Sequence, residues 1–253
     1  MQISVETNLK LEKLEDNIKP VEYPYRELTG CLTYLMVSSR PDISAAVNYL
    51  SRFQSRPSEE HWKCLKRVLR YLQGNRLEYQ RNDKCEPLIG FADADWGSDV
   101  NDRKSTSGFV FKVFGNAVLW SSRKQATVSL SSTEAEYVSL SQASCEAIWL
   151  RNLLTEFGVT MDVPLTMYED NQSCIRIAEE PRDQKRMKHL DIRYNYIREC
   201  IQNGFIKLKY IPTNEQLADI FTKGLQSNQF RKHCHTLGLR GGVGKADLVV
   251  NKP

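Results

Sequence analysis

The chain has 253 residues, 41% of them hydrophobic, which is enough for one well-packed core and a smaller second unit. Its formal net charge of only +4 excludes a protein that coats nucleic acid by bulk charge, so any basic binding surface must be local. Seven cysteines without zinc-type spacing indicate reduced thiols in an intracellular protein, cytoplasmic or nuclear, and the lack of a long uncharged apolar run indicates no membrane partner.

The first part of the chain is expected to be a leader followed by helices. Residues 1–21 mix charged and apolar positions, and no residue before Pro20 marks the end of a helix or strand. We therefore expect a loose leader without regular structure. Over residues 25–75, apolar residues recur at helical spacing in three segments, of which Pro41 separates the first two and Gly74 ends the third. The sequence therefore predicts a small helical unit over residues 22–80.

Beyond residue 81 the pattern changes to short β-rich runs that alternate with helices. Strands are expected at 88–92, 109–113, 117–120, 164–169 and 205–211, and helices at 132–157, directly after Asp170, at 190–202 and at 214–223. Three strands, a helix, a strand, helices, a strand and a helix are a mixed α/β order. We expect this α/β unit to span residues 81–226 and residues 227–253 to be a C-terminal tail.

Acidic residues occur where predicted strands end. Asp93 ends the first strand and Asp170 the fourth, although a polar strand end and a helix cap are structural explanations for them. Asp219 stands among four apolar neighbours in the last predicted helix, 214–223, whose start has the capping-box spacing from Thr213 to Gln216. Each of these acids alone is therefore open to a structural or a chemical interpretation.

The long predicted helix carries two glutamates, which its periodicity distinguishes. Glu136 extends an apolar stripe that continues through Leu140 and Ala143 at steps of four and three residues, so its carboxylate faces inward and needs a partner. Glu134 stands three residues after Ser131, the spacing of a capping box in which it would bond a free backbone N–H. We therefore assign Glu134 to structure and Glu136 to chemistry.

Taken together, the acids form a set that can converge on one point. The four members are Asp93, Glu136, Asp170 and Asp219. Converging carboxylates repel one another unless cations lie between them, and hard oxygen ligands select Mg²⁺, with Mn²⁺ as a substitute. Two such ions about 4 Å apart are a known clamp for phosphodiester hydrolysis, in which one activates water and the other stabilises the leaving 3′ oxygen. The sequence thus predicts a two-metal site.

Motifs in a fixed order along the chain carry a family resemblance. They include Asp93-Ala94-Asp95-Trp96, Arg103-Lys104-Ser105-Thr106-Ser107-Gly108, Glu134-Ala135-Glu136-Tyr137, Glu169-Asp170-Asn171-Gln172, Lys188-His189-Leu190-Asp191 and Leu217-Ala218-Asp219-Ile220. In this order, and over about residues 22–240, the chain resembles the C-terminal part of the polyprotein of copia-type long-terminal-repeat retrotransposons. So many ordered motifs make a chance resemblance negligible.

The resemblance implies an α/β fold, a ribonuclease H-like mixed five-stranded sheet flanked by helices. The preceding helical unit would be a thumb and connection remnant of a reverse transcriptase, and without fingers and palm no DNA synthesis is expected. The four acids fall on the family's metal-binding positions. Many ribonucleases H also place a His shortly before the last acid, where this chain has none. His189 is an auxiliary candidate, although a structural role for it is equally open.

Basic residues are expected to hold the nucleic acid through its phosphates. Residues 181–210 contain eight Lys or Arg against three acids, which favours a phosphate track. Lys63, Lys66, Arg67 and Arg70 lie on one face of the third predicted helix. This face either is solvated surface or binds phosphates, and both interpretations stay open. The predicted contacts are Arg103, Lys104, Ser105, Lys185, Arg186, Lys188 and Arg193. Selection of RNA must read the 2′-OH, which serine and threonine hydroxyls can do.

The sequence and the resemblance together predict a metal-dependent endoribonuclease that cuts the RNA strand of RNA–DNA hybrids. Other polyprotein segments are expected as further partners, and virus-like particles as an additional location. A non-catalytic nucleic-acid-binding or assembly fragment stays open as an alternative. A transposase or integrase is disfavoured because those enzymes rely on a late Glu where this chain has Asp219.

Overall fold

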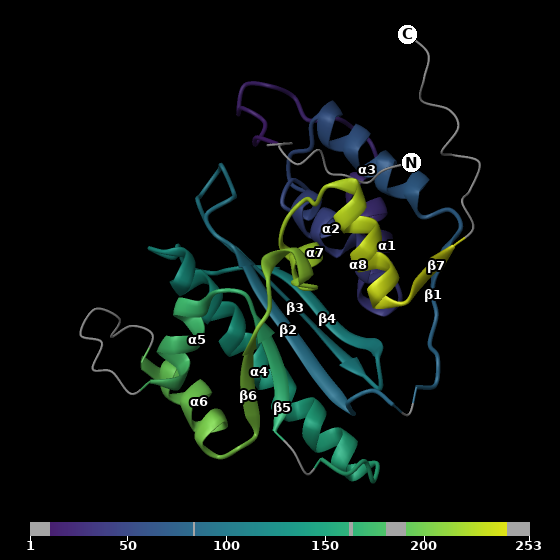
Figure 1. Ribbon diagram of the computed structural model, residues 1–253. Coiled ribbons are helices and arrows are strands. Elements are labelled where there is room, and N and C mark those ends of the chain that lie inside the picture. Colours follow the sequence, from purple (N-terminus) through teal and green to yellow (C-terminus); the bar gives the residue numbers. More distant parts are fainter. Residues whose placement is uncertain (1–10, 83, 162–163, 181–190, 242–253) are drawn as a thin grey trace. The chain divides into compact units, whose positions relative to one another are not determined.

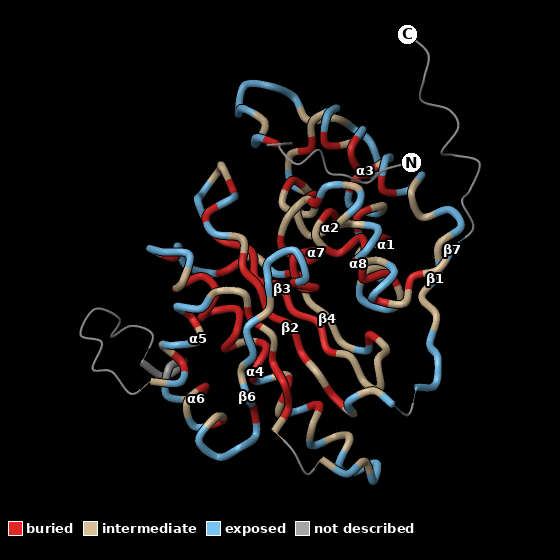
Figure 2. Tube along the Cα trace, viewed as in Figure 1, coloured by how far each residue is buried: buried red, intermediate tan, exposed pale blue. Residues whose placement is uncertain are grey.

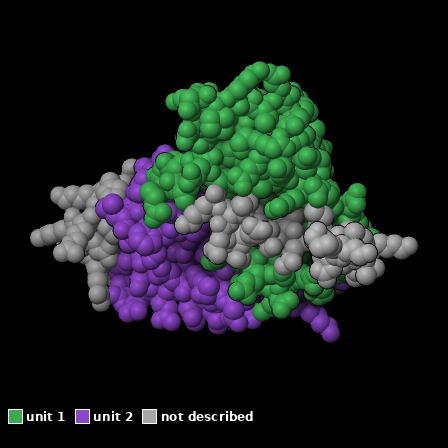
Figure 3. All heavy atoms as spheres, turned by 90° about the horizontal axis from the view of Figure 1, so that it is seen from above, with its two compact units in different colours: residues 1–79, 99–103, 223–253 green, residues 80–98, 104–222 purple. Residues whose placement is uncertain are grey.

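The structure is a computed structural model that describes residues 11–82, 84–161, 164–180 and 191–241, without the side chains of 191–194 (Figure 1). The chain forms two compact units, which Figure 3 colours separately. Each unit has its own core of buried residues, drawn red in Figure 2. Unit 1 comprises the described residues of Met1–Tyr79, Asp99–Arg103 and Lys223–Pro253, and unit 2 those of Gln80–Ser98 and Lys104–Thr222. None of the described helices is both long and apolar enough to cross a membrane.

Unit 1 is mainly helical. It contains α1 (Tyr25–Ser38), a 3-10 helix (Pro41–Ile43), α2 (Ser44–Ser51), α3 (Glu59–Tyr71), α8 (Ser227–Leu237) and the antiparallel strands β1 (Asn75–Leu77) and β7 (Leu239–Gly241). The three helices predicted near the N-terminus are confirmed. Their buried faces share one core, to which Leu32, Val47 and Leu65 contribute.

The described parts of the expected leader and tail are packed in unit 1. Leu11 is buried, and its backbone N–H donates to the Tyr49 hydroxyl at 2.9 Å. In the expected tail, α8 places Phe230 edge-on against Tyr71, and β7 pairs with β1. These contacts join residues far apart in the sequence, which explains why local patterns did not indicate them.

Unit 2 is built on a mixed five-stranded sheet in the order β4-β3-β2-β5-β6. Its strands are β2 (Leu88–Asp95), β3 (Thr106–Val113), β4 (Asn116–Lys124), β5 (Leu165–Glu169) and β6 (Ile206–Tyr210). The first three are antiparallel neighbours, whereas β5 runs parallel to β2 and β6 parallel to β5. The helices are α4 (Ser132–Glu156), α5 (Gln172–Glu179), α6 (Asp191–Gln202) and α7 (Asp219–Thr222). The predicted α/β class and five-stranded sheet are confirmed.

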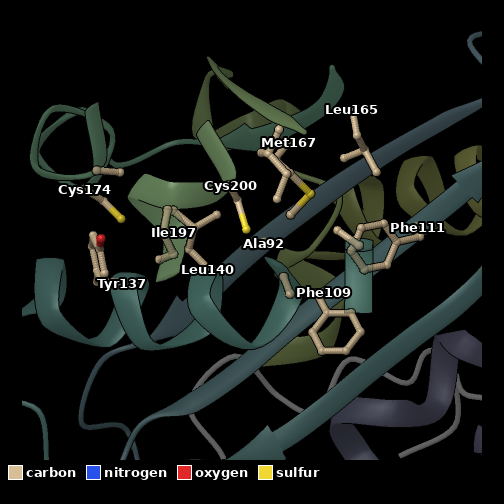
Figure 4. Close-up of a cluster of buried hydrophobic side chains, with 14 of the residues drawn as sticks. Ala92, Phe109, Phe111, Tyr137, Leu140, Leu165, Met167, Cys174, Ile197 and Cys200 are labelled. Atoms are coloured by element: carbon tan, nitrogen blue, oxygen red, sulfur yellow. The ribbon is translucent and has the colours of Figure 1, made fainter. Parts of the chain in front are cut away.

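Helices α4 and α7 pack on opposite faces of β3. Phe109 shares a core with Tyr137 and Leu140 of α4, as Figure 4 shows. Successive side chains of a strand point to opposite faces, so the preceding residue, Gly108, faces away from α4. A Cβ atom at Gly108 would lie 2.6 Å from Cγ2 of Thr222 in α7. Glycine is therefore required where α7 approaches the sheet.

The continuous last helix predicted at 214–223 is wrong. A 3-10 helix covers Thr213–Glu215, and α7 begins only at Asp219. The buried side chain of Gln216 donates to the carbonyl oxygen of Ala92 at 2.9 Å and accepts from the Ala218 N–H at 3.2 Å. Gln216 therefore fastens the chain to β2, and the predicted capping box with Thr213 does not form.

Candidate metal centre

Three of the four predicted ligands converge in unit 2. Asp93 lies near the end of β2, Glu136 near the start of α4 and Asp170 directly after β5. Each offers a carboxylate oxygen, and these oxygens lie within 4.8 Å of one another. Asp93 and Glu136 are buried, whereas Asp170 is partly exposed. The group is thus a cluster of acidic side chains of which Asp170 is the accessible member.

The strand pairing explains this convergence. Strands β2 and β5 are parallel neighbours, so their carboxyl ends meet at the same edge of the sheet. The start of α4 brings Glu136 to that edge because Glu136 continues the helix face that holds Leu140 in the core. Asn171 caps α5 by accepting from the Cys174 N–H at 3.0 Å. The cap role considered for Asp170 therefore belongs to Asn171.

Asp219 is not a member of the converging group of described residues. It begins α7 and is 1% exposed. Two neighbours in the chain fasten its segment beside Asp93, since Gln216 donates to the Ala92 carbonyl and the Thr222 hydroxyl donates to Oδ2 of Asp93. The role of Asp219 as a fourth ligand stays a prediction.

Glu134 has the structural role expected from its spacing. Its backbone N–H donates to the Ser131 hydroxyl at 3.2 Å, and its Oε2 accepts from the Leu130 N–H at 2.8 Å. The glutamate therefore binds a backbone N–H group before the helix, one residue earlier than in a standard capping box. Its carboxylate is engaged in holding the start of α4.

Glu169 is an acid of this region that the sequence analysis missed. It is the last residue of β5 and is fully buried. Its Oε1 accepts from the Asn171 N–H at 3.1 Å, whereas its Oε2 is buried without a hydrogen-bond partner among the described residues. Strand alternation could have indicated its burial, because Leu165 and Met167 precede Glu169 at two-residue spacing on the buried face of the strand.

The pKa values of Glu136 and Glu169 are raised well above their ordinary value of 4.5. Burial raises the pKa of Glu136 most, followed by the negative charges of Glu169, Asp93 and Asp170. Burial is also the largest cause of the raised pKa of Glu169. The hydrogen bond from the Asn171 backbone lowers this pKa, whereas the charges of Asp93 and Asp170 raise it. Ionisation of Glu136 or of Glu169 is therefore electrostatically unfavourable at these places.

The donor set fits a hard divalent cation. All of the converging atoms are carboxylate oxygens, which Mg²⁺ and Mn²⁺ prefer as ligands. Oε2 of Glu136, like that of Glu169, is buried without a hydrogen-bond partner among the described residues. A cation at this place would neutralise the repulsion and supply a partner for an orphaned oxygen.

The predicted nucleic-acid contacts divide into three groups. Ser105 is fully buried and its hydroxyl accepts from the Gly97 N–H at 3.0 Å, which corrects the predicted surface contact. Arg103 is exposed and Lys104 partly exposed. Lys185, Arg186, Lys188 and His189 lie outside the described residues, as does the side chain of Arg193. The phosphate contacts of the last two groups stay predictions.

Comparison with known proteins places this chain among transposon polyproteins. No protein-family model matches it. It is 38% identical over 239 residues to the retrovirus-related Pol polyprotein from transposon TNT 1-94 of Nicotiana tabacum, covering 92% of this chain and 18% of that protein. It is 40% identical over 217 residues to the Pol polyprotein from transposon RE1 of Arabidopsis thaliana, covering 85% of this chain and 15% of that protein. The chain belongs to the copia-type transposon Pol family. It spans less than a fifth of the length of these relatives.

Two further similarities accompany this Pol family assignment. Secreted RxLR effector protein 161 of Plasmopara viticola is 53% identical over 130 residues, which are 50% of this chain and 91% of that protein. The crystal structure of LC11-RNase H1 in complex with RNA/DNA hybrid covers 53% of this chain and 93% of that chain, at 19% identity and a TM-score of 0.40. The strand order and directions of the sheet themselves confirm the ribonuclease H-like fold expected for this part of a Pol polyprotein.

The raised pKa values predict an unusual pH dependence of stability. Without divalent metal, the raised pKa values keep Glu136 and Glu169 protonated in the folded protein to a higher pH than in the unfolded chain, where glutamates ionise near pH 4.5. Their contribution to the free energy of unfolding is therefore full at low pH and falls as the pH rises above about 4.5. Glu169→Gln removes one ionising group, so we expect its free energy of unfolding to fall less than the parent's between about pH 5 and pH 8.

Urea unfolding at several pH values, with and without Mg²⁺, checks this expectation. Glu156→Gln is the matched control, since Glu156 is exposed at the end of α4, and its profile should follow the parent's. Addition of Mg²⁺ should restore the parent's stability at pH 8. Parallel profiles for Glu169→Gln and the parent would contradict the electrostatic account of the site.

Proposed function

We propose that unit 2 is a metal-dependent endoribonuclease that cuts the RNA strand of RNA–DNA hybrids. The observation that carries the proposal is the convergence of Asp93, Glu136 and Asp170 within 4.8 Å at one sheet edge, in a chain of the copia-type Pol family. Membership in this family makes nucleic acid the expected substrate. The carboxylates supply the charge and donor type that metal-assisted phosphodiester hydrolysis requires.

The residues of the site have distinct tasks in this proposal. Asp93, Glu136 and Asp170 would hold Mg²⁺ or Mn²⁺, with Asp219 as a fourth ligand. The bound ions would supply the activated water and stabilise the leaving 3′ oxygen. Asp170 is the partly exposed member and therefore lies toward the substrate, whereas burial of Asp93 and Glu136 keeps bulk water from competing for the ions.

Binding of the hybrid is assigned mainly to the basic segment before α6. Lys185, Arg186 and Lys188, followed by Arg193, would neutralise phosphates without reading base sequence. In unit 1, Lys63, Arg67 and Arg70 are exposed on one face of α3, and no acid follows Glu60 within that helix. That face is a second candidate for phosphate contacts. Cytoplasmic or nuclear action, or packaging in virus-like particles, is part of the same proposal.

The two glutamates of α4 give the sharpest test of the catalytic proposal. Glu136→Gln should lower hybrid cleavage by at least about a hundredfold with little loss of stability, because it removes a metal-ligand charge. Glu134→Gln should cleave at nearly the parental rate, since its amide oxygen can still accept from the Leu130 N–H. The measurement is cleavage of a labelled RNA–DNA hybrid with and without Mg²⁺, alongside thermal unfolding.

Asp93→Asn and Asp170→Asn extend that comparison to the sheet edge, with the same expected loss of cleavage. Loss in Glu134→Gln but not in Glu136→Gln would overturn the site assignment. A parent chain that binds the hybrid without cutting it in Mg²⁺ would instead favour the non-catalytic binding fragment.

The basic segment has its own test. Replacing Lys185, Arg186 and Lys188 together with Gln should weaken hybrid binding and reduce its salt slope by up to about three units, if each contacts one phosphate. Turnover at saturating hybrid should change far less, because these residues hold substrate. The matched triple in α3, at Lys63, Arg67 and Arg70, should have the smaller effect, because unit 1 holds none of the converging acids. An unchanged salt slope in the first triple would exclude the segment as the phosphate track.

A further inference from the structure

Thr222 contacts the candidate metal centre, although the sequence analysis assigned it no role there. It ends α7, three residues after Asp219, and is 5% exposed. Its hydroxyl donates to Oδ2 of Asp93 and lies 3.2 Å from the backbone carbonyl oxygen of Asp219. A hydroxyl has one proton, and an ionised carboxylate is the stronger acceptor. The proton of Thr222 therefore goes to Asp93.

The sheet fixes the place of this hydroxyl. Gly108 lies directly opposite Asp93 in the β2–β3 pairing. A Cβ atom at Gly108 would lie 2.6 Å from Cγ2 of Thr222 and 2.8 Å from Cβ of Phe221, so only glycine admits α7 at this distance. The Gln216 side chain holds the preceding turn to the Ala92 carbonyl of β2. The hydroxyl of Thr222 is thus placed by contacts with two strands.

Asp93 is in turn held through both its backbone and its side chain. The Ser139 hydroxyl of α4 donates to the Asp93 carbonyl oxygen at 2.7 Å, while Thr222 of α7 binds the carboxylate. These two helices pack on opposite faces of β3, whose Gly108 pairs with Asp93, and each helix supplies one of the two hydrogen bonds. A carboxylate with one oxygen bound in this way cannot rotate without breaking a buried hydrogen bond.

We propose that Thr222 is a positioning residue for Asp93, one of the proposed metal ligands. Its hydroxyl orients the Asp93 carboxylate so that the remaining lone pairs face Glu136, Asp170 and the cation. The inference rests on the proposed metal site and concerns how that site is held, not which reaction it performs. Hydrogen-bonding partners of metal ligands typically contribute 10- to 100-fold in metal affinity or activity, roughly the effect expected here.

Substitutions at Thr222 separate the hydroxyl from the methyl group that packs on Gly108. Thr222→Val keeps the shape and removes the hydroxyl, so we expect Mn²⁺ to bind about 10- to 100-fold more weakly. Thr222→Ser keeps the hydroxyl, so its Mn²⁺ affinity should stay near the parent's even if its melting temperature falls. Thr33→Val is the control, because the Thr33 hydroxyl donates to the Thr29 carbonyl within α1 of unit 1 at 2.8 Å.

Mn²⁺ affinity is measured by calorimetric titration of the whole chain, with hybrid cleavage as a second readout. A merely structural role would lower the melting temperatures of Thr222→Val and Thr222→Ser while leaving Mn²⁺ affinity unchanged, and that result overturns the proposal. If Thr222→Val does not fold, Thr222→Ala replaces it, since it differs from Thr222→Ser only in the hydroxyl. Equal Mn²⁺ affinity in the Ala and Ser variants also overturns the proposal.

The two readouts distinguish this inference from the proposed nuclease activity. A parent that binds Mn²⁺ but leaves the hybrid intact overturns the nuclease proposal, while weaker Mn²⁺ binding by Thr222→Val still supports the positioning role. Cleavage by the parent with unchanged Mn²⁺ affinity in Thr222→Val overturns the positioning role alone. A parent that binds no Mn²⁺ overturns both.

Discussion

Repulsion among carboxylates buried at one edge of a sheet is the constraint on which the rest of the site depends. Asp93 and Glu136 are buried together, Asp170 lies within reach of both, and Glu169 adds a further charge beside Glu136. Isolated charges of one sign are costly in a protein interior, so this arrangement is stable only with protons or cations between the oxygens. At neutral pH a divalent cation is the more effective partner, because it neutralises two charges and satisfies oxygen lone pairs.

The fold meets this constraint by fastening each acid to a rigid element. The parallel pairing of β2 and β5 sets the spacing of Asp93 and Asp170, and the core face of α4 sets the place of Glu136. Hydrogen bonds from Ser139 and Thr222 then hold Asp93 itself. Preorganisation of this kind matters because a metal site tolerates only small errors in ligand position. The stability lost to repulsion is recovered when the cation binds.

Local periodicity made much of the site predictable. The 3.6-residue period of α4 distinguished Glu136, which lies in the converging group, from Glu134, which binds backbone at the start of the helix. Strand alternation in β5 likewise places Glu169 on the buried face with Leu165 and Met167. Contacts between distant segments could not be read in this way. The bond from Gln216 to the Ala92 carbonyl joins residues 124 apart and interrupts a segment whose local pattern is helical. The packing of α8 and β7 in unit 1 is likewise set by partners far away in the sequence.

The most direct test of the central claim is crystallographic. Crystals of the chain soaked in Mn²⁺ should show an anomalous difference peak between Asp93, Glu136 and Asp170, with carboxylate oxygens about 2 to 2.5 Å from the ion. The same soak of Glu136→Gln crystals should give a weaker peak or none, because one ligand charge is lost. Peaks elsewhere on the protein with none among these acids would contradict the account of the site.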